Sequence, residues 1–313
     1  MDFRLRVFKS VAENLSFTKA AKELYISQPA ISKHINELEQ LYKVMLFERK
    51  GGKITLTHVG EVFLRHVRTI LDNYGELAYD MELMSGSYSG EIRIGASTTI
   101  AQYLISPLLA NFISRFPNIK VVLETGNSSL IENMLEGQRI DVGLVEGGTR
   151  RANLRYSKFA KDELVLVTSS SNRCKESAYF CEDAALKDGV NPKDVLLLDS
   201  IPLVLRESGS GTLDIIEKEL AKNNLKLLDL NILLHIGSTE GIKQFLQSNK
   251  TSYAILSVIS LLNELKSNML KIVDLYGGDI EREFSFVTRQ GGNHERVDKF
   301  INFANYWYSS NML

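Results

Sequence analysis

The sequence predicts an α/β protein with a small helical head, one long connecting helix and two α/β lobes. Three observations indicate this order. Short amphipathic helical patterns fill residues 1–41, a heptad pattern of apolar residues runs from His58 to about Ser85, and apolar strands alternate with helical patterns from Glu91 onward. A chain of 313 residues is long enough for two or three domains.

Composition excludes several classes of protein. Hydrophobic residues make up 44% of the chain and charged residues 24%, which argues against a disordered or fibrous protein. No apolar run reaches the roughly 18 residues that span a bilayer, and residues 1–6 lack the apolar core of a signal peptide. The only cysteines, Cys174 and Cys181, exclude a disulfide scaffold. We therefore expect a cytoplasmic protein that does not contact a membrane.

Charge is distributed unevenly along a chain whose formal net charge is only -1. Residues 1–68 carry 12 Lys and Arg against 7 Asp and Glu, whereas the remainder carries 25 against 31. A basic head on an acidic body suggests that the head meets a polyanion. The excess is modest, so this interpretation depends on the motif within the head.

The head reads as three short helices. In the first, Leu5, Phe8 and Val11 recur at three-residue intervals and form one apolar stripe. We expect Thr18 to cap the start of the second helix and Ser27 to cap the third. The third helix carries Pro29 in its first turn, where the missing N–H costs little, and its expected buried stripe is Ile31, Ile35, Leu38 and Leu41.

Two helices joined by a tight turn, with polar side chains at the start of the second, describe a helix-turn-helix. On its outer face, Gln28 can read adenine, Lys33 can reach guanine or phosphate, and the surface of Pro29 can touch a thymine methyl. Residues 47–56 then read as a hairpin with Gly51-Gly52 at its turn, a basic wing suited to the minor groove. The alternative is an ordinary three-helix bundle with a solvated basic loop.

The residues of the head distinguish these alternatives. The segments Phe17–Ile35, Leu38-Glu39, Leu46–Arg49 and Leu56-Thr57, followed by Gly60, closely resemble the LysR-type transcriptional regulators. The motif covers about the first 60 residues, and the order of features in the rest of the chain is also similar to that family. Two departures are Tyr42, where the family usually has glycine, and His58-Val59, where it usually has a small residue before Gly60. The resemblance implies that the DNA-binding residues are Thr18, Ser27, Gln28, Pro29, Ser32, Lys33, Arg49 and Lys53.

The connecting helix carries a heptad seam of apolar residues that it cannot bury alone. The seam consists of Phe63, Val67, Ile70, Tyr74, Leu77 and Met81, with Met84 after them. Packing against its own chain is one possible use of this seam. The resemblance favours dimerisation, with two such helices holding two heads apart, and leaves homodimer and homotetramer both open.

Two copies of a βαβ pattern predict the body of the protein. Together with the resemblance, they imply a winged helix-turn-helix, a long linker helix and a two-lobed periplasmic-binding-protein-like effector domain. The expected boundaries are 1–58 for the DNA-binding domain, 59–85 for the linker and dimerisation helix, 86–90 for a hinge, 91–163 with 270–313 for lobe I, and 164–269 for lobe II.

Small hydroxyl-rich or glycine-rich segments follow four of the predicted strands, each at the start of a helix. Ligands of open α/β folds bind beyond the carboxyl ends of strands, and helix N-termini favour anions. These residue types also cap helices without any ligand, which is the alternative for each single segment. Four such segments at corresponding positions predict a small anionic effector, contacted by Ser97, Thr98, Thr99, Gln102, Asn127, Ser128, Glu207, Ser208, Ser210, Thr212, Ser238 and Thr239.

Other chemistry has little support in the sequence. The histidines show no metal-ligand spacing with the cysteines, and no nucleophile elbow, dinucleotide fingerprint or Walker loop is present, so we expect no catalytic residue, metal or cofactor. A redox switch at Cys174 and Cys181, a solute-binding protein and an enzyme of the lobe interface were the rival hypotheses. The favoured hypothesis is a cytoplasmic, ligand-responsive transcription factor whose partners are double-stranded DNA, the effector, further copies of the chain and, as a candidate, RNA polymerase.

Overall fold

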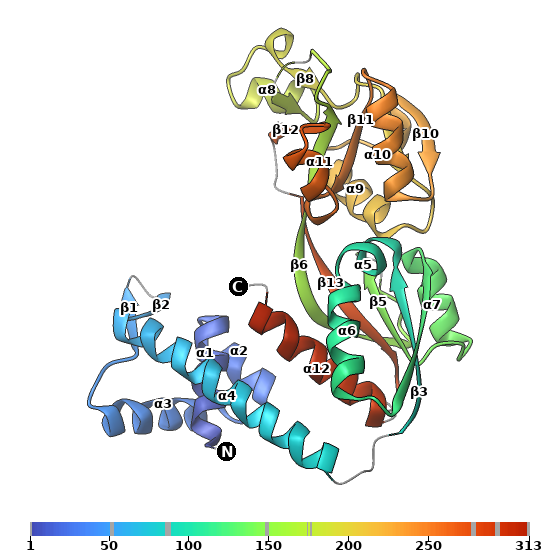
Figure 1. Cartoon of the computed structure of the whole chain (residues 1–313). Helices are drawn as coiled ribbons and strands as arrows, with labels where there is room; N and C mark the ends of the chain where they lie inside the picture. Colours follow the sequence, from blue (N-terminus) through green and yellow to red (C-terminus); the bar gives the residue numbers. More distant parts are fainter. Residues whose placement is uncertain are drawn as a thin grey trace. The chain divides into compact units, whose positions relative to one another are not determined.

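The computed structural model describes residues 2–50, 53–84, 89–147, 150–173, 175, 177–276, 280–291 and 295–311. The chain forms two compact units, Met1–Tyr88 and Ser89–Leu313 (Figure 1). The side chains of Arg49 and Lys53, most of the predicted hinge, the Gly51-Gly52 turn and Cys174 lie outside the described residues. Among the described residues, no helix combines the length and the apolar character that crossing a membrane requires.

Three helices build the first unit: α1 (Phe3–Asn14), α2 (Phe17–Leu24) and α3 (Gln28–Tyr42). The predicted Ser27 cap is confirmed, because its side chain accepts a hydrogen bond from the Ala30 amide. The predicted Thr18 cap is wrong. Ser16, in extended conformation, accepts from the Lys19 amide and caps α2, so Thr18 already lies inside the helix.

The core of this unit contains the expected apolar stripes, with one exception. Leu5, Phe8 and Val11 of α1 pack against Ile31, Ile35 and Leu38 of α3. Leu41 was expected in the same stripe but is 58% exposed. It lies in the last turn of α3, beyond the part of the helix that the core covers.

A hairpin and a long helix complete the first unit. Strands β1 (Phe47–Lys50) and β2 (Lys53–Leu56) pair antiparallel, which confirms the predicted hairpin. Helix α4 (His58–Met84) follows. Its first turns pack on the head, since Val67 is buried in the head core and Phe63 packs against it. These two members of the predicted seam therefore contact their own chain.

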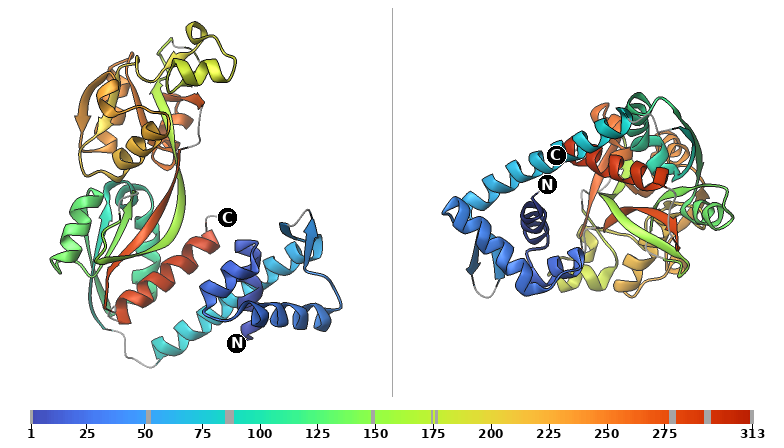
Figure 2. Two further views of the ribbon diagram at one scale, coloured as in Figure 1. Left: turned by 180° about the vertical axis from the view of Figure 1, so that it is seen from behind. Right: turned by 90° about the horizontal axis from the view of Figure 1, so that it is seen from below.

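The second unit has two lobes joined by long antiparallel strands, β6 (Leu154–Ser169) and β13 (Ile280–Arg289), which run from one lobe into the other (Figures 1 and 2). The main sheet has the order β10-β9-β11-β6-β13-β5-β3-β4. Both crossing strands are central in this order, so each lobe lies on one side of them. Sequence patterning predicted only parts of these strands, Leu164–Thr168 of β6 and Phe284–Val287 of β13.

Lobe I is a parallel βαβαβ unit closed by the C-terminal helix. Its elements are β3 (Gly90–Ser97), α5 (Thr98–Tyr103), α6 (Ile105–Arg115), β4 (Ile119–Gly126), α7 (Ser128–Glu136), β5 (Val142–Glu146) and α12 (Glu295–Asn311). Helix α12 packs on α6 through Phe112, whose ring lies 5.2 Å from that of Phe300. Segments from both ends of the unit thus share one core.

Lobe II repeats the strand-helix alternation. Its main elements are β9 (Leu203–Arg206), α9 (Gly211–Lys222), β10 (Ile232–Ile236), α10 (Thr239–Ser248), β11 (Tyr253–Ser257) and α11 (Leu262–Lys266). At its far end lie β7 (Ser177–Tyr179), α8 (Glu182–Lys187), β8 (Leu196–Leu197) and β12 (Leu270–Tyr276). Leu270 and Val273 of β12 are buried in lobe II cores, so the return to lobe I begins in β13 and not at residue 270.

Candidate nucleic-acid interface and lobe interface

The start of α3 presents a polar surface to solvent. Ser27, Gln28, Pro29 and Lys33 are exposed and Ser32 is partly exposed. The Gln28 side-chain amide donates to Ser32 Oγ at 2.9 Å, which restrains it against the helix. An open cavity of about 570 Å³ is lined by Gln28, Pro29, Ser32, Lys33, Asn36, Glu37 and Gln40. Thr18 is exposed on α2, whereas nothing is described of the Arg49 and Lys53 side chains.

A buried arginine joins the two lobes. Arg206 ends β9 of lobe II and is only 1% exposed. Its guanidinium donates to Thr98 of lobe I at 3.0 Å and to Thr239 of lobe II at 3.2 Å. Its charge is met by Glu207, 2.8 Å away. Burial opposes ionisation of Glu207, but hydrogen bonding and charge from Arg206 outweigh it and lower the pKa of that carboxyl.

Asn127, Ser129 and Gly211 make further contacts between the two lobes beside Arg206. The Asn127 side chain caps α7 through the Leu130 amide and also donates to Glu207 at 3.3 Å and to the Ser208 carbonyl at 3.4 Å. The Ser129 amide donates to the Gly209 carbonyl across the lobes. A Cβ on Gly211 would lie 1.9 Å from the carbonyl oxygen of Glu146, so only glycine permits this approach of α9 to β5.

Polar side chains meet in a buried network at the carboxyl end of β5. Glu146 is 3% exposed and accepts hydrogen bonds from Ser97 and from Thr99. Arg282 of β13 lies 3.8 Å from Glu146 and donates to Thr212 at 2.8 Å. The network continues to Asp162, which accepts a hydrogen bond from that guanidinium, and to Ser257.

Asp162 binds Arg282 Nε at 2.6 Å and accepts from Ser257 Oγ at 2.8 Å. Two polar groups at this interface have no hydrogen-bond partner among the described residues, the Ser210 hydroxyl and Arg282 Nη2. Ser210 is the N-cap residue of α9, yet its side chain makes no capping bond. Both residues are at most 3% exposed, so each is a buried donor that lacks an acceptor.

A second contact between the lobes lies at α5 and α10. Tyr103 of α5 donates to Glu240 of α10, and Lys243 pairs with Glu240 at 2.7 Å. Burial first, and then the hydrogen bond to Glu240, raise the pKa of Tyr103. The phenol therefore stays protonated and acts as a donor here.

The predicted effector residues fall into three groups. Ser97, Thr98, Thr99, Asn127, Ser128, Glu207, Ser208, Ser210, Thr212 and Thr239 lie at or beside the lobe interface, as the contacts above and the bond from Ser128 Oγ to the Glu146 carbonyl indicate. Ser238 caps α10 through the Gly241 amide. Gln102 is exposed on α5 and makes no contact that supports its assignment.

Sequence reasoning missed the charged members of the interface. Arg206, Glu146, Asp162 and Arg282 were not assigned to the site. Arg206 and Glu146 each end an apolar strand, and a charged residue in that place is the signal that could have found them. Asp162 and Arg282 stand between other charged residues and give no such signal. Their partners come from other elements, so only the fold could identify the pairs.

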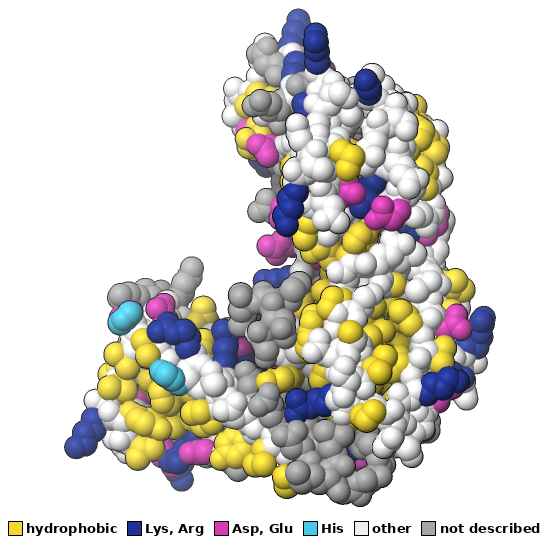
Figure 3. Space-filling model, in the orientation of Figure 1, with side chains coloured by type: hydrophobic (Ala, Val, Ile, Leu, Met, Phe, Trp, Pro, Cys, Tyr) yellow, Lys and Arg dark blue, Asp and Glu magenta, His cyan; other side chains and the backbone are white. Residues whose placement is uncertain are grey.

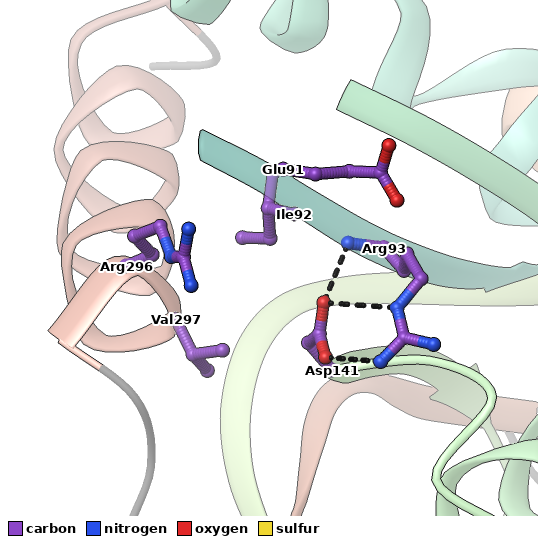
Figure 4. Close-up of a pocket in the computed structure, with 6 residues that line it drawn as sticks. All are labelled: Glu91, Ile92, Arg93, Asp141, Arg296 and Val297. Atoms are coloured by element: carbon purple, nitrogen blue, oxygen red, sulfur yellow. Dashed lines mark hydrogen bonds and ion pairs between the residues drawn. The ribbon is translucent and has the colours of Figure 1, made fainter. Parts of the chain in front are cut away.

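Another cavity, of about 270 Å³, lies at the opposite end of β3 from the lobe interface (Figure 4). Asp141 holds Arg93 there by contacts of 2.8 Å to its amide and 2.9 Å to its guanidinium. Arg296 of α12 faces the cavity from the other wall and lies against Gly90. Sequence reasoning did not predict this cavity. Within the described part of the chain, no group of three His, Cys, Asp or Glu is placed to hold a metal.

Comparison with known proteins agrees with this architecture. Residues 3–61 match the family "Bacterial regulatory helix-turn-helix protein, lysR family", and residues 85–308 match "LysR substrate binding domain". A probable RuBisCO transcriptional regulator of Thalassiosira pseudonana is 28% identical over 312 residues, which cover 99% of this chain and 97% of that protein.

Two solved structures show the same fold. The CcmR regulatory domain of Synechocystis PCC6803 in complex with 2-PG has a TM-score of 0.59 at 23% identity, over 72% of this chain and 99% of that one. Full-length CbnR with its target DNA has a TM-score of 0.52 at 20% identity, over 97% and 98%. Family members and curated relatives such as these are transcriptional regulators and not enzymes. On these matches, which together span nearly the whole sequence, the chain belongs to the LysR family of transcriptional regulators.

Proposed function

We propose that this regulator binds its operator through α3 and the β1–β2 hairpin, and that a small anionic effector held between the two lobes modulates that binding. The protein acts in the cytoplasm as a homodimer or homotetramer, and RNA polymerase is a candidate partner on DNA. Two features of the chain carry the proposal. One is the exposed polar surface of α3, and the other is the set of buried donors at the lobe interface, some of which lack an acceptor among the described residues.

The α3 face has the chemistry for reading bases in the major groove. Because Gln28 already donates one N–H to Ser32, its carbonyl oxygen and second N–H have no partner among the described residues. That donor-acceptor pair matches adenine N6 and N7. Lys33 is exposed one turn further on and can reach guanine or phosphate.

The lobe interface has the chemistry for holding an anion. Arg206 and Arg282 bring two buried positive charges to it, and within the described part of the chain Ser210 Oγ and Arg282 Nη2 are donors without acceptors. Ser210 also starts the 12-residue helix α9, whose positive dipole end favours negative charge. Binding of 2-PG by the related CcmR domain is consistent with a small ligand in a domain of this fold.

An exposed apolar seam on α4 supports self-association. Ile70, Tyr74, Leu77 and Met81 are each more than 40% exposed and recur at steps of four, three and four. Such a seam is typical of a helix that pairs with a second helix. In the second unit, apolar side chains also gather on the outer face of α6 (Figure 3), where Ile113 is 47% exposed.

The experiment uses the full chain and two pairs of variants. Selection from a duplex library identifies the operator, and anisotropy over a salt series then measures binding. Lys33→Ala should lower the slope of log K against log salt by about one, whereas Lys266→Ala, an exposed lysine of α11, should leave it unchanged.

A panel of small anions then tests the effector arm. Ser210→Ala should reduce the anion response of DNA binding and keep operator affinity without anion, while Ser248→Ala on the exposed end of α10 should change neither. Loss of operator binding in Ser210→Ala would contradict the division of labour. Chemical turnover of a bound anion would instead favour an enzyme.

A further inference from the structure

The carboxylate of Glu146 already occupies part of the site in which the effector is proposed to bind. It lies at the end of β5, in which every residue is buried. It accepts from Ser97 Oγ and from Thr99 Oγ1, the latter at 3.3 Å. Both hydroxyls belong to the segment that the sequence assigns to the effector. The protein's own carboxylate therefore takes the donors that an external anion would use.

The charged groups around Glu146 do not favour the binding of a further anion. Asp162 already pairs with Arg282 at 2.6 Å, while Glu146 is further from the same guanidinium, at 3.8 Å. Arg206 is likewise neutralised by Glu207. With all these groups ionised, three carboxylates (Glu146, Asp162 and the partly exposed Glu207) face two buried guanidiniums. An ionised carboxylate in a buried site strongly disfavours a second negative charge placed beside it.

Two buried donors at the lobe interface nevertheless indicate that an acceptor can bind near Glu146. Arg282 Nη2 and Ser210 Oγ have no acceptor among the described residues, and Thr212, two residues after Ser210 in the chain, accepts from Arg282 Nη1. Buried donors are normally satisfied. A site that offers donors and also holds an excess carboxylate can take an anion once that carboxylate is neutral.

We infer that the effector anion binds together with one proton, and that Glu146 receives this proton. The inference rests on the function proposed above. A proton from solvent adds to the Glu146 carboxylate, giving a neutral acid whose O–H donates to the anion. Ser97 and Thr99 then turn their hydroxyls from Glu146 toward the ligand. Glu146 thus acts as a specificity-determining residue that couples anion binding to pH.

Other titratable groups border the site and must be distinguished from Glu146. Asp162 faces it from β6 through Arg282, and Asp214 of α9 lies beside Gly147. Glu207 faces it from the end of β9, held by Arg206. From β10, His235 Nδ1 lies 2.8 Å from the Arg206 carbonyl. Ser128 of α7 adds only a hydroxyl, bonded to the Glu146 carbonyl.

The test measures binding of sulfate, which remains a dianion between about pH 5 and about pH 8, the range in which histidine and perturbed groups titrate. Calorimetry on the full chain should show affinity rising as pH falls, by up to about tenfold per pH unit. Repeating the titration in buffers of different ionisation heat should reveal uptake of close to one proton by the wild-type protein. This second measurement needs no variant.

The variants then locate the proton. Glu146→Gln, which imitates the neutral acid, should bind sulfate with little dependence on pH and at least as tightly at pH 8 as the wild type does at the acid end. Glu217→Gln, on the exposed face of α9, should behave as wild type. Asp214→Asn and His235→Asn should keep the pH dependence.

The outcomes separate this inference from the proposed function. Sulfate binding without proton uptake, or a pH dependence that persists in Glu146→Gln and disappears in Asp214→Asn or His235→Asn, would overturn the role of Glu146 while leaving an anion site in place. If neither the wild type nor Glu146→Gln binds sulfate or any anion of the panel at any pH, the anionic effector itself is wrong. Proton uptake that is lost in Glu146→Gln with retained binding supports the inference.

Discussion

At the scale of single residues, Gln28 is the side chain whose contacts bear most directly on recognition of the DNA sequence. Its bond to Ser32 Oγ fixes the amide against α3 before DNA arrives. Gln28→Ala should therefore cost about 1–3 kcal/mol at the cognate operator and relax the choice of base at one position. Selection of duplexes with the variant would measure this. An unchanged preference at every position would argue against the assigned role.

Gly211 tests how closely the lobes must approach. A methyl group there would meet the carbonyl oxygen of Glu146 and, at 2.7 Å, Ser128 Oγ. Because a backbone atom is in the way, Gly211→Ala should force α9 from β5 and destabilise the second unit by about 1–3 kcal/mol. Denaturation of the full chain would detect this change.

The control for Gly211 is Gly137, at the end of α7. Its added Cβ would come no closer than 3.3 Å to the Asn133 carbonyl, and its φ of -75° suits any residue. Gly137→Ala should thus change stability little. Equal effects of the two substitutions would mean that the lobes are not held by the α9–β5 contact.

At the scale of elements, α4 combines two uses of one apolar pattern. Its first turns pack into the head through Phe63 and Val67, and the following turns expose Ile70, Tyr74, Leu77 and Met81. Leu77→Glu should weaken self-association about tenfold or more, ~1.4 kcal/mol, because a charge enters the seam. Native mass spectrometry across a dilution series would show the loss.

Thr69→Glu supplies the comparison for this helix. Thr69 is exposed, lies away from the seam and bonds only to the Arg65 carbonyl within α4. An added charge there should leave the assembly intact. If both variants remain associated, the contact between copies lies elsewhere, and the outer face of α6 becomes the next surface to test.

Local patterning predicted the elements well where burial follows a simple period. The helices of the head, the hairpin and most strands of both lobes were predicted because apolar spacing reports which face is buried, whereas the short strands β7 and β8 were not predicted. It did not predict where that burial stops, and for this reason Leu41 was misassigned. Thr18 was misassigned because Ser16, two residues earlier, is an equally suitable capping residue and begins the helix. The full length of β6 was missed because Leu154–Glu163, the larger part of the strand, is mostly polar and pairs with Glu281–Arg289 of β13, a segment distant in sequence.

The candidate site was likewise predicted only in part. Hydroxyl residues at strand ends were predicted to meet, and most of them do lie at the lobe interface. The charged residues were not predicted, since a buried arginine or glutamate is stable only with a partner. Arg206 finds its partners on α5 and α10, and Glu146 finds them on β3, α5 and β13. The spacing of residues along the sequence does not predict such pairs.

At the scale of the whole molecule, ionised carboxylates help to hold the two lobes together. Glu207 bonds to Asn127 across the interface, and Arg206 lowers its pKa below the ordinary 4.5 despite the opposing effect of burial. A carboxyl with a lowered pKa in the folded state adds stability above its unfolded pKa and loses it as pH falls through the folded value. Stability of the second unit should therefore decline as the pH falls below about 4.5 and this carboxyl takes up a proton.

Denaturant unfolding of the full chain at pH 6 and at pH 4 measures this loss, and Glu207→Gln isolates its source. The variant cannot lose a charge on acidification, so its stability should fall less between the two pH values than that of the wild type. Glu217→Gln, exposed on α9, should fall as much as the wild type. If Glu207→Gln and the wild type decline equally, then Glu207 is not an ionised link between the lobes. Acid sensitivity would in that case come from other lowered carboxyls, such as Asp2 beside Arg4 in the head.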